Sequence, residues 1–148
     1  MTTEMILKAK TFYDKDADLN LIKGKKIVVL GYGSQGHAQA LNLKDSGLNV
    51  VVAVRPGGRG YNLAVKHGWT LGKNLITNNV EAIKDADWIH FLLPDEAQGK
   101  VWREEVAPNM KKGVVLSWSH GFNIRFGQVS PPKEADVVLI APKGPGHL

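Results

Sequence analysis

A glycine cluster that directly follows an apolar run constrains this chain more than any other feature. The run covers residues 27–30, and Gly31, Gly33 and Gly36 then form a G-x-G-x-x-G pattern. Such a run favours a strand and the residues after it favour a helix, so the sequence predicts a strand, a tight turn and a helix start. In this arrangement glycines permit the turn, the approach of a pyrophosphate and close helix packing, while amides at the helix start bind phosphate. The flanking segments make an ordinary glycine-rich turn the weaker alternative.

Strands and helices are expected to alternate along the rest of the chain. Further apolar runs predict strands at residues 49–54, 88–93, 114–118 and 136–141, with a poorly patterned strand or loop at 69–77. The intervening segments predict helices at residues 35–46, 61–67, briefly after Asn78 and Asn79, and from Asp95, as the N-cap, to Val106. This alternation predicts an α/β fold with a Rossmann-like, doubly wound, mainly parallel sheet. Residues 1–148 are expected to form one dinucleotide-binding domain, since this length suits a single core.

The first 23 residues are expected to form an arm that packs its apolar side chains, Leu19, Leu21 and Ile22, onto the domain. The alternating acids of Asp14–Asp18 also suit a calcium loop, but the later glycine and terminal glutamate of an EF-hand are absent there. We therefore favour a solvated arm. His90 lies in the middle of an apolar strand and is expected to be a hydrogen-bonded core histidine rather than a ligand.

Composition excludes several classes of function. The net charge is +5, but the basic residues are dispersed among acids, so no nucleic-acid partner is expected. No apolar run is long enough to cross a membrane, and the first 20 residues carry acids where a signal peptide would be basic and then apolar. The absence of cysteine excludes disulfides and thiolate metal sites. A cytoplasmic protein without a membrane partner is the resulting expectation.

The end of the second strand bears on the choice of cofactor. An Asp or Glu about 20 residues after the glycine cluster accepts the ribose hydroxyls of NAD, whereas an Arg accommodates the 2′-phosphate of NADP. The segment 49–60 contains no acid and supplies Arg55 and Arg59. The sequence therefore favours NADPH as the cofactor, with NADH as the other option and two solvated loop arginines as the alternative interpretation.

Polar or glycine-rich segments recur where the predicted strands end. They are Gly31–Gly36, Arg55–Gly60, Pro94–Gln98 and Ser119–Asn123, and Lys143 follows a fifth strand. Ligands of open α/β sheets bind beyond the carboxyl ends of the strands. We therefore expect these segments to gather around one ligand.

The same segments make the chain resemble a known enzyme family. The matching stretches are Tyr13–Leu19, Gly31–Ala40, Leu93–Gln98, Ser119–Ile124 and Ile140–His147. Together, in this order, they closely resemble ketol-acid reductoisomerase, also called acetohydroxyacid isomeroreductase, from about Phe12 to the end. The resemblance implies magnesium-assisted alkyl migration in 2-acetolactate or 2-aceto-2-hydroxybutyrate. Hydride transfer from NADPH would follow, in the synthesis of valine, leucine and isoleucine.

The strand ends and the resemblance together suggest a set of site residues. Those expected to bind the cofactor are Gly31, Tyr32, Gly33, Ser34, Gln35, Gly36, Arg55, Gly58, Arg59, Gly60, Leu93, Pro94, Asp95, Glu96, Ala97, Gln98, His120 and Gly146. The resemblance further implies catalytic roles for His120 and Lys143. A histidine near a strand end can exchange protons through water, and a lysine can stabilise negative charge that develops on an oxygen.

Some features depart from the family pattern. Gly58 and Gly60 stand where the family commonly has serines that contact the 2′-phosphate, so Arg59 is expected to take their place. The connection Trp69–Asn79 is longer than usual, and Arg125 replaces a common histidine.

The implied magnesium ions belong to a helical C-terminal domain, which would begin about where this sequence ends, and no metal site is expected within it. We therefore expect a chain that binds the dinucleotide but needs that domain for Mg²⁺, for the acetohydroxy acid and for catalysis. A stand-alone, non-catalytic dinucleotide-binding module or sensor is the alternative. A homo-oligomer is a further option, because loss of a partner domain exposes apolar surface.

Overall fold

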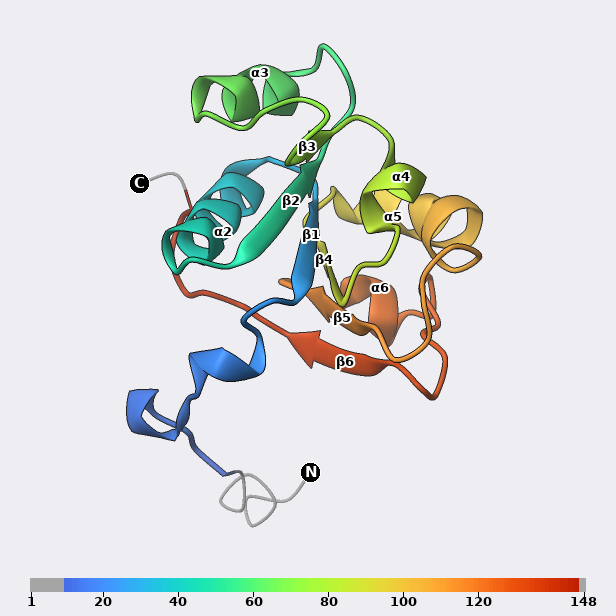
Figure 1. Ribbon diagram of the computed structural model, residues 1–148. Coiled ribbons are helices and arrows are strands. Elements are labelled where there is room, and N and C mark those ends of the chain that lie inside the picture. The colour runs from blue at the N-terminus through green and yellow to red at the C-terminus, as the bar shows by residue number, and fades with distance from the viewer. Residues whose placement is uncertain (1–9, 147–148) are drawn as a thin grey trace.

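The computed structural model describes residues 10–146, which build a six-stranded sheet with helices on both faces (Figure 1). The strands lie in the order β3-β2-β1-β4-β5-β6, and every neighbouring pair is parallel. Their bounds are β1 Lys26–Leu30, β2 Asn49–Ala53, β3 Leu75–Ile76, β4 Trp88–Phe91, β5 Val115–Trp118 and β6 Asp136–Leu139. This topology confirms the doubly wound, Rossmann-like prediction.

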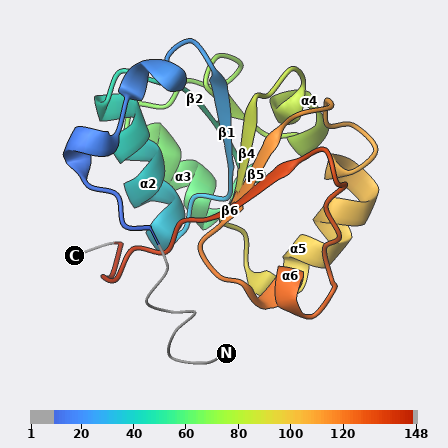
Figure 2. The ribbon, with the colours of Figure 1, turned by 90° about the horizontal axis from the view of Figure 1, so that it is seen from below.

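The helices divide between the two faces of the sheet. Seen from below, α2 (Ser34–Asp45) and α3 (Arg59–Lys66) lie on one side, and α4, α5 and α6 lie on the other (Figure 2). The latter three span Asn79–Ile83, Asp95–Val101 and Phe122–Arg125, and α5 continues into the π-helical turn η3, Trp102–Val106. Two short 3-10 turns, η1 (Asp14–Asp16) and η2 (Leu19–Leu21), precede β1.

Alternate residues of β1 enter two separate hydrophobic cores. Val28 and Leu30 pack into the core under α4 and η3, whereas Ile27 and Val29 pack into the core under α2 and α3. All four side chains are buried, which is why this strand reads as a continuous apolar run and not as an alternating one. β1 therefore fixes the centre of the molecule, with β2 on one side and β4 on the other.

Of two expected helix N-caps, one is wrong and one is confirmed. Pro94 and not Asp95 is the N-cap of α5, so Asp95 is the first helical residue. Proline fixes the backbone angle φ that a helix start needs, and the Asp95 carboxylate accepts a hydrogen bond from the Gln98 side chain instead of capping an amide. Asn78 does cap α4, since its side-chain oxygen accepts from the Glu81 amide, as the sequence predicted.

The prediction that the arm packs its leucines onto the domain is wrong for the described part, residues 10–23. Leu19 is 43% exposed and Leu21 is 74% exposed, and only Ile22 packs against the core under α2. The acids of the arm bond to their own backbone instead: Asp16 accepts from the Tyr13 amide and Asp18 from the Asn20 amide. These local bonds fold the arm into two turns that project away from the sheet (Figure 1).

The outer strand β6 also leaves apolar side chains uncovered. Val137, Val138 and Leu139 are all exposed at this edge of the sheet. Whether a second copy covers such surface stays a prediction. Among the described residues, no helix has the length and apolar character needed to cross a bilayer.

Two glycines of the cluster are required by close backbone contacts. Gly31 has a φ of 101°, and a Cβ atom added there would lie 2.6 Å from the Leu92 carbonyl oxygen. A Cβ atom on Gly36 would lie 2.5 Å from the Gly31 carbonyl oxygen. Gly33 differs, because a Cβ atom there would meet nothing within 4 Å. The first and third glycines thus serve the turn and the helix packing, and the second leaves the turn open on its outer side.

This difference predicts unequal effects of alanine. We expect Gly36→Ala to lower the free energy of unfolding by about 1–3 kcal/mol, because the new methyl group overpacks a backbone contact. Gly33→Ala serves as the matched control and is expected to cost less than about 1 kcal/mol, since only the N-cap preference changes. Urea denaturation of the two variants and the wild type measures both values. Equal losses would contradict the packing role of Gly36.

Candidate functional site

A cleft of about 680 Å³ opens beyond the carboxyl ends of β1, β2 and β4. Its walls are the turn between β1 and α2, the segment from β2 into α3, and the residues after β4. Ten of the predicted cofactor residues line it: Gly31, Tyr32, Gly33, Ser34, Arg55, Gly58, Arg59, Gly60, Leu93 and Pro94. Three of the polar strand ends thus meet at one cavity, where ligands of this fold bind.

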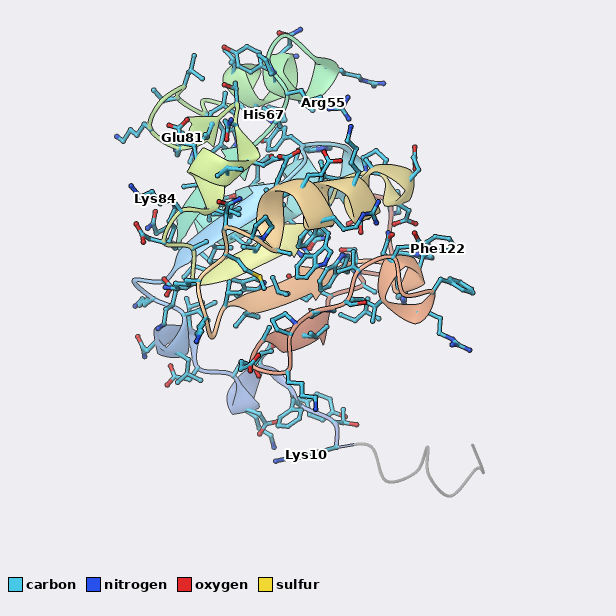
Figure 3. The ribbon with its side chains drawn as sticks, turned by 90° about the vertical axis from the view of Figure 1, so that its right-hand side faces the viewer. Lys10, Arg55, His67, Glu81, Lys84 and Phe122 are labelled. Carbon is cyan, nitrogen blue, oxygen red and sulfur yellow. The ribbon has the colours of Figure 1, made fainter. Side chains whose placement is uncertain are left out.

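The cleft suits an anion at two places. Gly33 is the N-cap of α2, a helix of 12 residues whose first amides lack partners within the helix and carry its positive dipole end. Arg55 and Arg59 also line the cleft, and none of the lining residues is an Asp or Glu. In Figure 3, Arg55 and His67 lie at the same upper end of the molecule. A ligand with two separated phosphate groups matches this distribution of charge.

Sequence reasoning missed an aromatic cluster in the same cleft. The Trp69 indole N–H donates to the Tyr32 hydroxyl at 2.6 Å, and that hydroxyl lies 3.0 Å from His67 Nδ1. Burial raises the pKa of Tyr32, partly offset by the bond from Trp69. His37 joins the group, with its Nδ1 2.7 Å from the Gly33 carbonyl oxygen. His67 is the last residue of the helix predicted at 61–67, and nothing local to either histidine indicates that the two rings meet.

The remaining residues after β4 form a second group with the loop after β5. Gln98 donates to the Leu93 carbonyl at 2.7 Å, and Asn123 donates to the Asp95 carbonyl and to the Gln98 side chain. His120 Nδ1 lies 3.3 Å from an Asp95 carboxylate oxygen. Two of the predicted strand ends, Pro94–Gln98 and Ser119–Asn123, are therefore brought together next to the cleft.

The hydrogen-bond partner of His120 Nδ1 depends on whether this nitrogen carries a hydrogen. The Phe122 amide donates to Nδ1 at 3.3 Å, which requires a free lone pair, whereas the Asp95 contact requires a hydrogen on the same atom. The imidazole is 71% exposed, so it can rotate and exchange protons with solvent. The role of His120 as a proton carrier stays a prediction.

The described segment after β6 reaches the start of α2. Gln35 donates to the Gly144 carbonyl at 3.0 Å, and a Cβ atom on Gly146 would collide with the Ser34 carbonyl. The described residues after β6 pass alongside α2 in Figure 1. Lys143 is exposed in this segment. Neither Lys143 nor His120 lines the cleft, and Glu96 and Ala97, on the first turn of α5, also lie outside it.

One side chain on α2 ties these segments to the sheet. The Gln39 amide nitrogen donates to Gln35 Oε1 at 3.1 Å and to Ser119 Oγ at 2.9 Å. Its carbonyl oxygen accepts from His90 Nε2 at 2.7 Å. Because His90 donates there, its Nδ1 accepts from the Ser117 hydroxyl, also at 2.7 Å.

His90 is therefore the hydrogen-bonded core histidine that the sequence predicted, and it is only 2% exposed. Burial lowers the pKa of its imidazole, so the neutral form is favoured. Trp88 completes the chain of bonds by donating its indole N–H to Ser117 at 2.6 Å. The network runs without an unpaired member from the middle of the sheet to the residue before His120.

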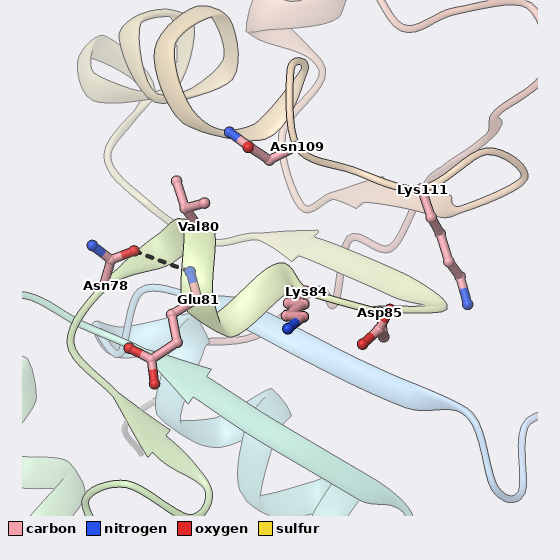
Figure 4. A pocket seen from close by; sticks show the side chains of 7 residues that line it. All are labelled: Asn78, Val80, Glu81, Lys84, Asp85, Asn109 and Lys111. Carbon is pink, nitrogen blue, oxygen red and sulfur yellow. Dashed lines mark hydrogen bonds between the residues drawn. The ribbon is translucent and has the colours of Figure 1, made fainter.

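A second hollow, of about 570 Å³, lies beside α4 (Figure 4). Lys84, Asp85 and Lys111 line it and precede β4 and β5, so it belongs to the opposite end of the sheet. Lys111 is already paired with Asp87 at 2.6 Å. Within residues 10–146, no group of three His, Asp or Glu side chains is placed to hold a metal ion.

Comparisons with known proteins agree with this geometry. The family model described as acetohydroxy acid isomeroreductase, NADPH-binding domain, matches residues 21–148. Among solved structures, the chain is similar to an NADH-preferring ketol-acid reductoisomerase from an uncultured archean, at 38% identity and a TM-score of 0.82. The match covers 93% of this chain and 42% of that enzyme, so the chain spans less than half of its length.

More distant structures share the fold alone. A putative oxidoreductase from Jannaschia sp. matches at 21% identity with a TM-score of 0.62, over 76% of this chain and 39% of that one. A semialdehyde dehydrogenase NAD-binding protein from Cupriavidus necator, solved with calcium and NAD, matches at 21% identity with a TM-score of 0.63, over the same shares of the two chains.

The buried state of His90 predicts a dependence of stability on pH. Its pKa is lowered in the folded chain, so the unfolded chain binds more protons once the pH falls through the ordinary value near 6.5. The stability that neutral His90 contributes is complete above that value and is lost on acidification, by at most about 1.4 kcal/mol per pH unit. We expect His90→Gln to remove this part of the slope when urea denaturation is repeated between pH 7.5 and 5. An unchanged slope would show that His90 is not held neutral.

Proposed function

The chain belongs to the acetohydroxy acid isomeroreductase family as its NADPH-binding domain, and we propose that its cleft binds NADPH in preference to NADH. The observation that carries this proposal is the convergence of the α2 start with Arg55 and Arg59 on one cavity. The α2 end and the open side of Gly33 suit the pyrophosphate that both dinucleotides share. The two arginines suit the additional phosphate that only NADPH carries.

The preference for NADPH depends on charge rather than on hydroxyl donors. Gly58 and Gly60 line the cleft without a side-chain donor, and the similar archaeal enzyme prefers NADH according to its description. In this chain, however, the same wall carries two guanidinium groups and no carboxylate that would repel a phosphate or bind ribose hydroxyls. We therefore place the 2′-phosphate at Arg55 and Arg59.

The proposed positions of the two phosphate groups also give the direction in which the cofactor crosses the sheet. With the adenosine end at the β2 side and the pyrophosphate at Gly33, the nicotinamide extends toward the carboxyl ends of β4 and β5. The residues there are Asp95 and Gln98 on α5 and His120 after β5. Gln39 holds the His120 loop in place through Ser119, so the candidate proton carrier is positioned from inside the domain.

For the whole enzyme, we propose the family reaction. Alkyl migration in 2-acetolactate or 2-aceto-2-hydroxybutyrate would precede reduction by NADPH, and Mg²⁺ would polarise the substrate oxygens. The described residues supply no fitting set of magnesium ligands, so we assign no metal step to them. Their part is to bind and orient the hydride donor, and His120 and Lys143 are the proposed proton carrier and oxyanion partner. The cytoplasmic location stays a prediction.

A non-catalytic dinucleotide-binding module is a second candidate function, because no group of residues within 10–146 is placed to hold a metal ion. Incubation of the 148-residue chain with Mg²⁺, 2-acetolactate and NADPH separates the two when NADPH oxidation and binding are both recorded. Binding without oxidation, together with restored oxidation on addition of a separately produced C-terminal helical domain of the family, supports the enzyme. Binding that never leads to oxidation supports the module. No binding at millimolar cofactor would contradict both.

The 2′-phosphate assignment predicts a selective loss. We expect Arg55→Ala to weaken NADPH binding roughly 10- to 100-fold, because a charge-assisted contact to phosphate is removed, and to change NADH binding little. Isothermal titration of both cofactors measures the ratio, and Arg103→Ala, an exposed arginine on η3, is the matched control. Equal losses for NADPH and NADH would exclude a phosphate role for Arg55.

The proton-carrier assignment predicts a different pattern. In a longer enzyme that carries this domain, we expect His120→Ala to lower turnover while NADPH affinity stays within about twofold, since the imidazole lies outside the cleft. Steady-state kinetics and a separate cofactor titration distinguish the two effects. Unchanged turnover would contradict the assignment.

A further inference from the structure

Two histidines line the cleft beside the residues assigned to the phosphate groups. His37 lies in the first turns of α2 and His67 follows α3, yet both line the same cavity. Their ring centres are 5.8 Å apart, and each lies 5.9 Å from the ring centre of Tyr32. The three side chains therefore form one compact wall next to Gly33 and the β2 end.

The hydrogen bonds around Tyr32 fix which nitrogen of His67 carries the proton. The Trp69 indole can only donate, so the Tyr32 oxygen accepts its N–H. Tyr32 is 3% exposed, and His67 Nδ1 is the only acceptor that its hydroxyl hydrogen has within residues 10–146. A buried hydroxyl needs such an acceptor, so Tyr32 donates to Nδ1. The hydrogen of the neutral His67 ring must then be on Nε2, which has no partner among the described residues and is free to donate to a ligand.

His37 is fixed in the opposite sense. Its Nδ1 lies 2.7 Å from the Gly33 carbonyl oxygen, and a carbonyl can only accept. Nδ1 therefore carries the hydrogen, and Nε2 of the neutral ring presents a lone pair. No hydrogen bond to this Nε2 is formed within the described part of the chain. The cleft wall thus offers one donor, His67 Nε2, beside one acceptor, His37 Nε2.

A hydrogen-bond donor beside an acceptor limits which ligand groups can bind to the pair. An ionised phosphate offers acceptors only, so it would leave the lone pair of His37 unmatched. Ribose hydroxyls both donate and accept, and the edges of adenine pair an amino group with a ring nitrogen. We propose that His67 and His37 form a subsite for the uncharged part of the adenosine moiety, leaving the 2′-phosphate to Arg55 and Arg59. This inference rests on the proposed dinucleotide binding.

Loss of a histidine contact is expected to affect the two cofactors equally, whereas loss of Arg55 is expected to affect NADPH alone. Adenosine is common to NADPH and NADH, so loss of a histidine contact weakens both by the same factor. Nicotinamide mononucleotide, which lacks adenosine, is insensitive to that loss. The histidines thus contribute affinity without contributing to the choice between the two cofactors.

The test uses His67→Leu in the 148-residue chain, with isothermal titration of NADPH, NADH and nicotinamide mononucleotide. We expect roughly three- to tenfold weaker binding of both dinucleotides, the usual cost of one hydrogen bond, and no change for the mononucleotide. His67 is only partly buried, and thermal unfolding shows whether the variant is folded. Asn62→Ala, an exposed position on α3 outside the cleft, is the matched control.

A second variant keeps the test independent of any damage from leucine. Tyr32→Phe leaves His67 in place but removes the hydroxyl that fixes its proton, so we expect a smaller loss that is again equal for NADPH and NADH. Titration with nicotinamide hypoxanthine dinucleotide identifies the contacted group. If the effect of His67→Leu disappears with this analogue, the contact is to N1 of adenine, and if it persists, the contact is to ribose or to a ring nitrogen that the analogue retains; both outcomes support the subsite.

Other outcomes overturn the proposal. A loss confined to NADPH would make His67 a phosphate ligand, and unchanged affinities for both dinucleotides would exclude any role in binding. If the wild-type chain binds neither dinucleotide, the proposed function fails and this inference fails with it. That result is distinguishable, because it is seen before any variant is compared.

Discussion

The close approach of α2 to the turn after β1 is the constraint on which the rest of the structure depends. Gly36 packs against the Gly31 backbone, and Gly31 against the backbone at Leu92, at distances that leave no room for a Cβ atom. This contact places the positive end of α2 above the middle of the sheet, between the ends of β2 and β4. The anion-binding part of the cleft is therefore a consequence of backbone packing rather than of any charged side chain.

A polar network inside the same layer joins this helix to the rest of the site. Gln39 bonds to His90 in the sheet, to Ser119 after β5 and to Gln35, which in turn holds Gly144. The Gln39 amide nitrogen donates and its carbonyl oxygen accepts, so both polar atoms of this side chain are paired. The segments that carry His120 and Lys143 are held by bonds from α2, the helix whose start we propose as the phosphate-binding site.

The cleft contains charged groups and neutral hydrogen-bonding groups on different residues. Its charged elements, the α2 end and the two arginines, suit phosphate, and its neutral elements, the two histidines fixed by Tyr32 and Gly33, suit an uncharged donor and acceptor. In our proposal, affinity for the common part of a dinucleotide and discrimination by the extra phosphate therefore depend on different residues. The matched family model, an NADPH-binding domain, agrees with dinucleotide binding in this cleft.

The sequence by itself determined the strands, the glycine turn and three strand ends that meet at the cleft, because these depend on short-range patterns of apolar residues and backbone freedom. Only the tertiary structure decided that Tyr32 meets His67 and Trp69, and that Gln39 meets His90 and Ser119. These pairs are separated by 35 to 80 residues, and no local pattern records which distant side chain completes a hydrogen bond. The arm differs, because its leucines suggested packing in the sequence, whereas local bonds of Asp16 and Asp18 fold it into two turns and leave Leu19 and Leu21 exposed.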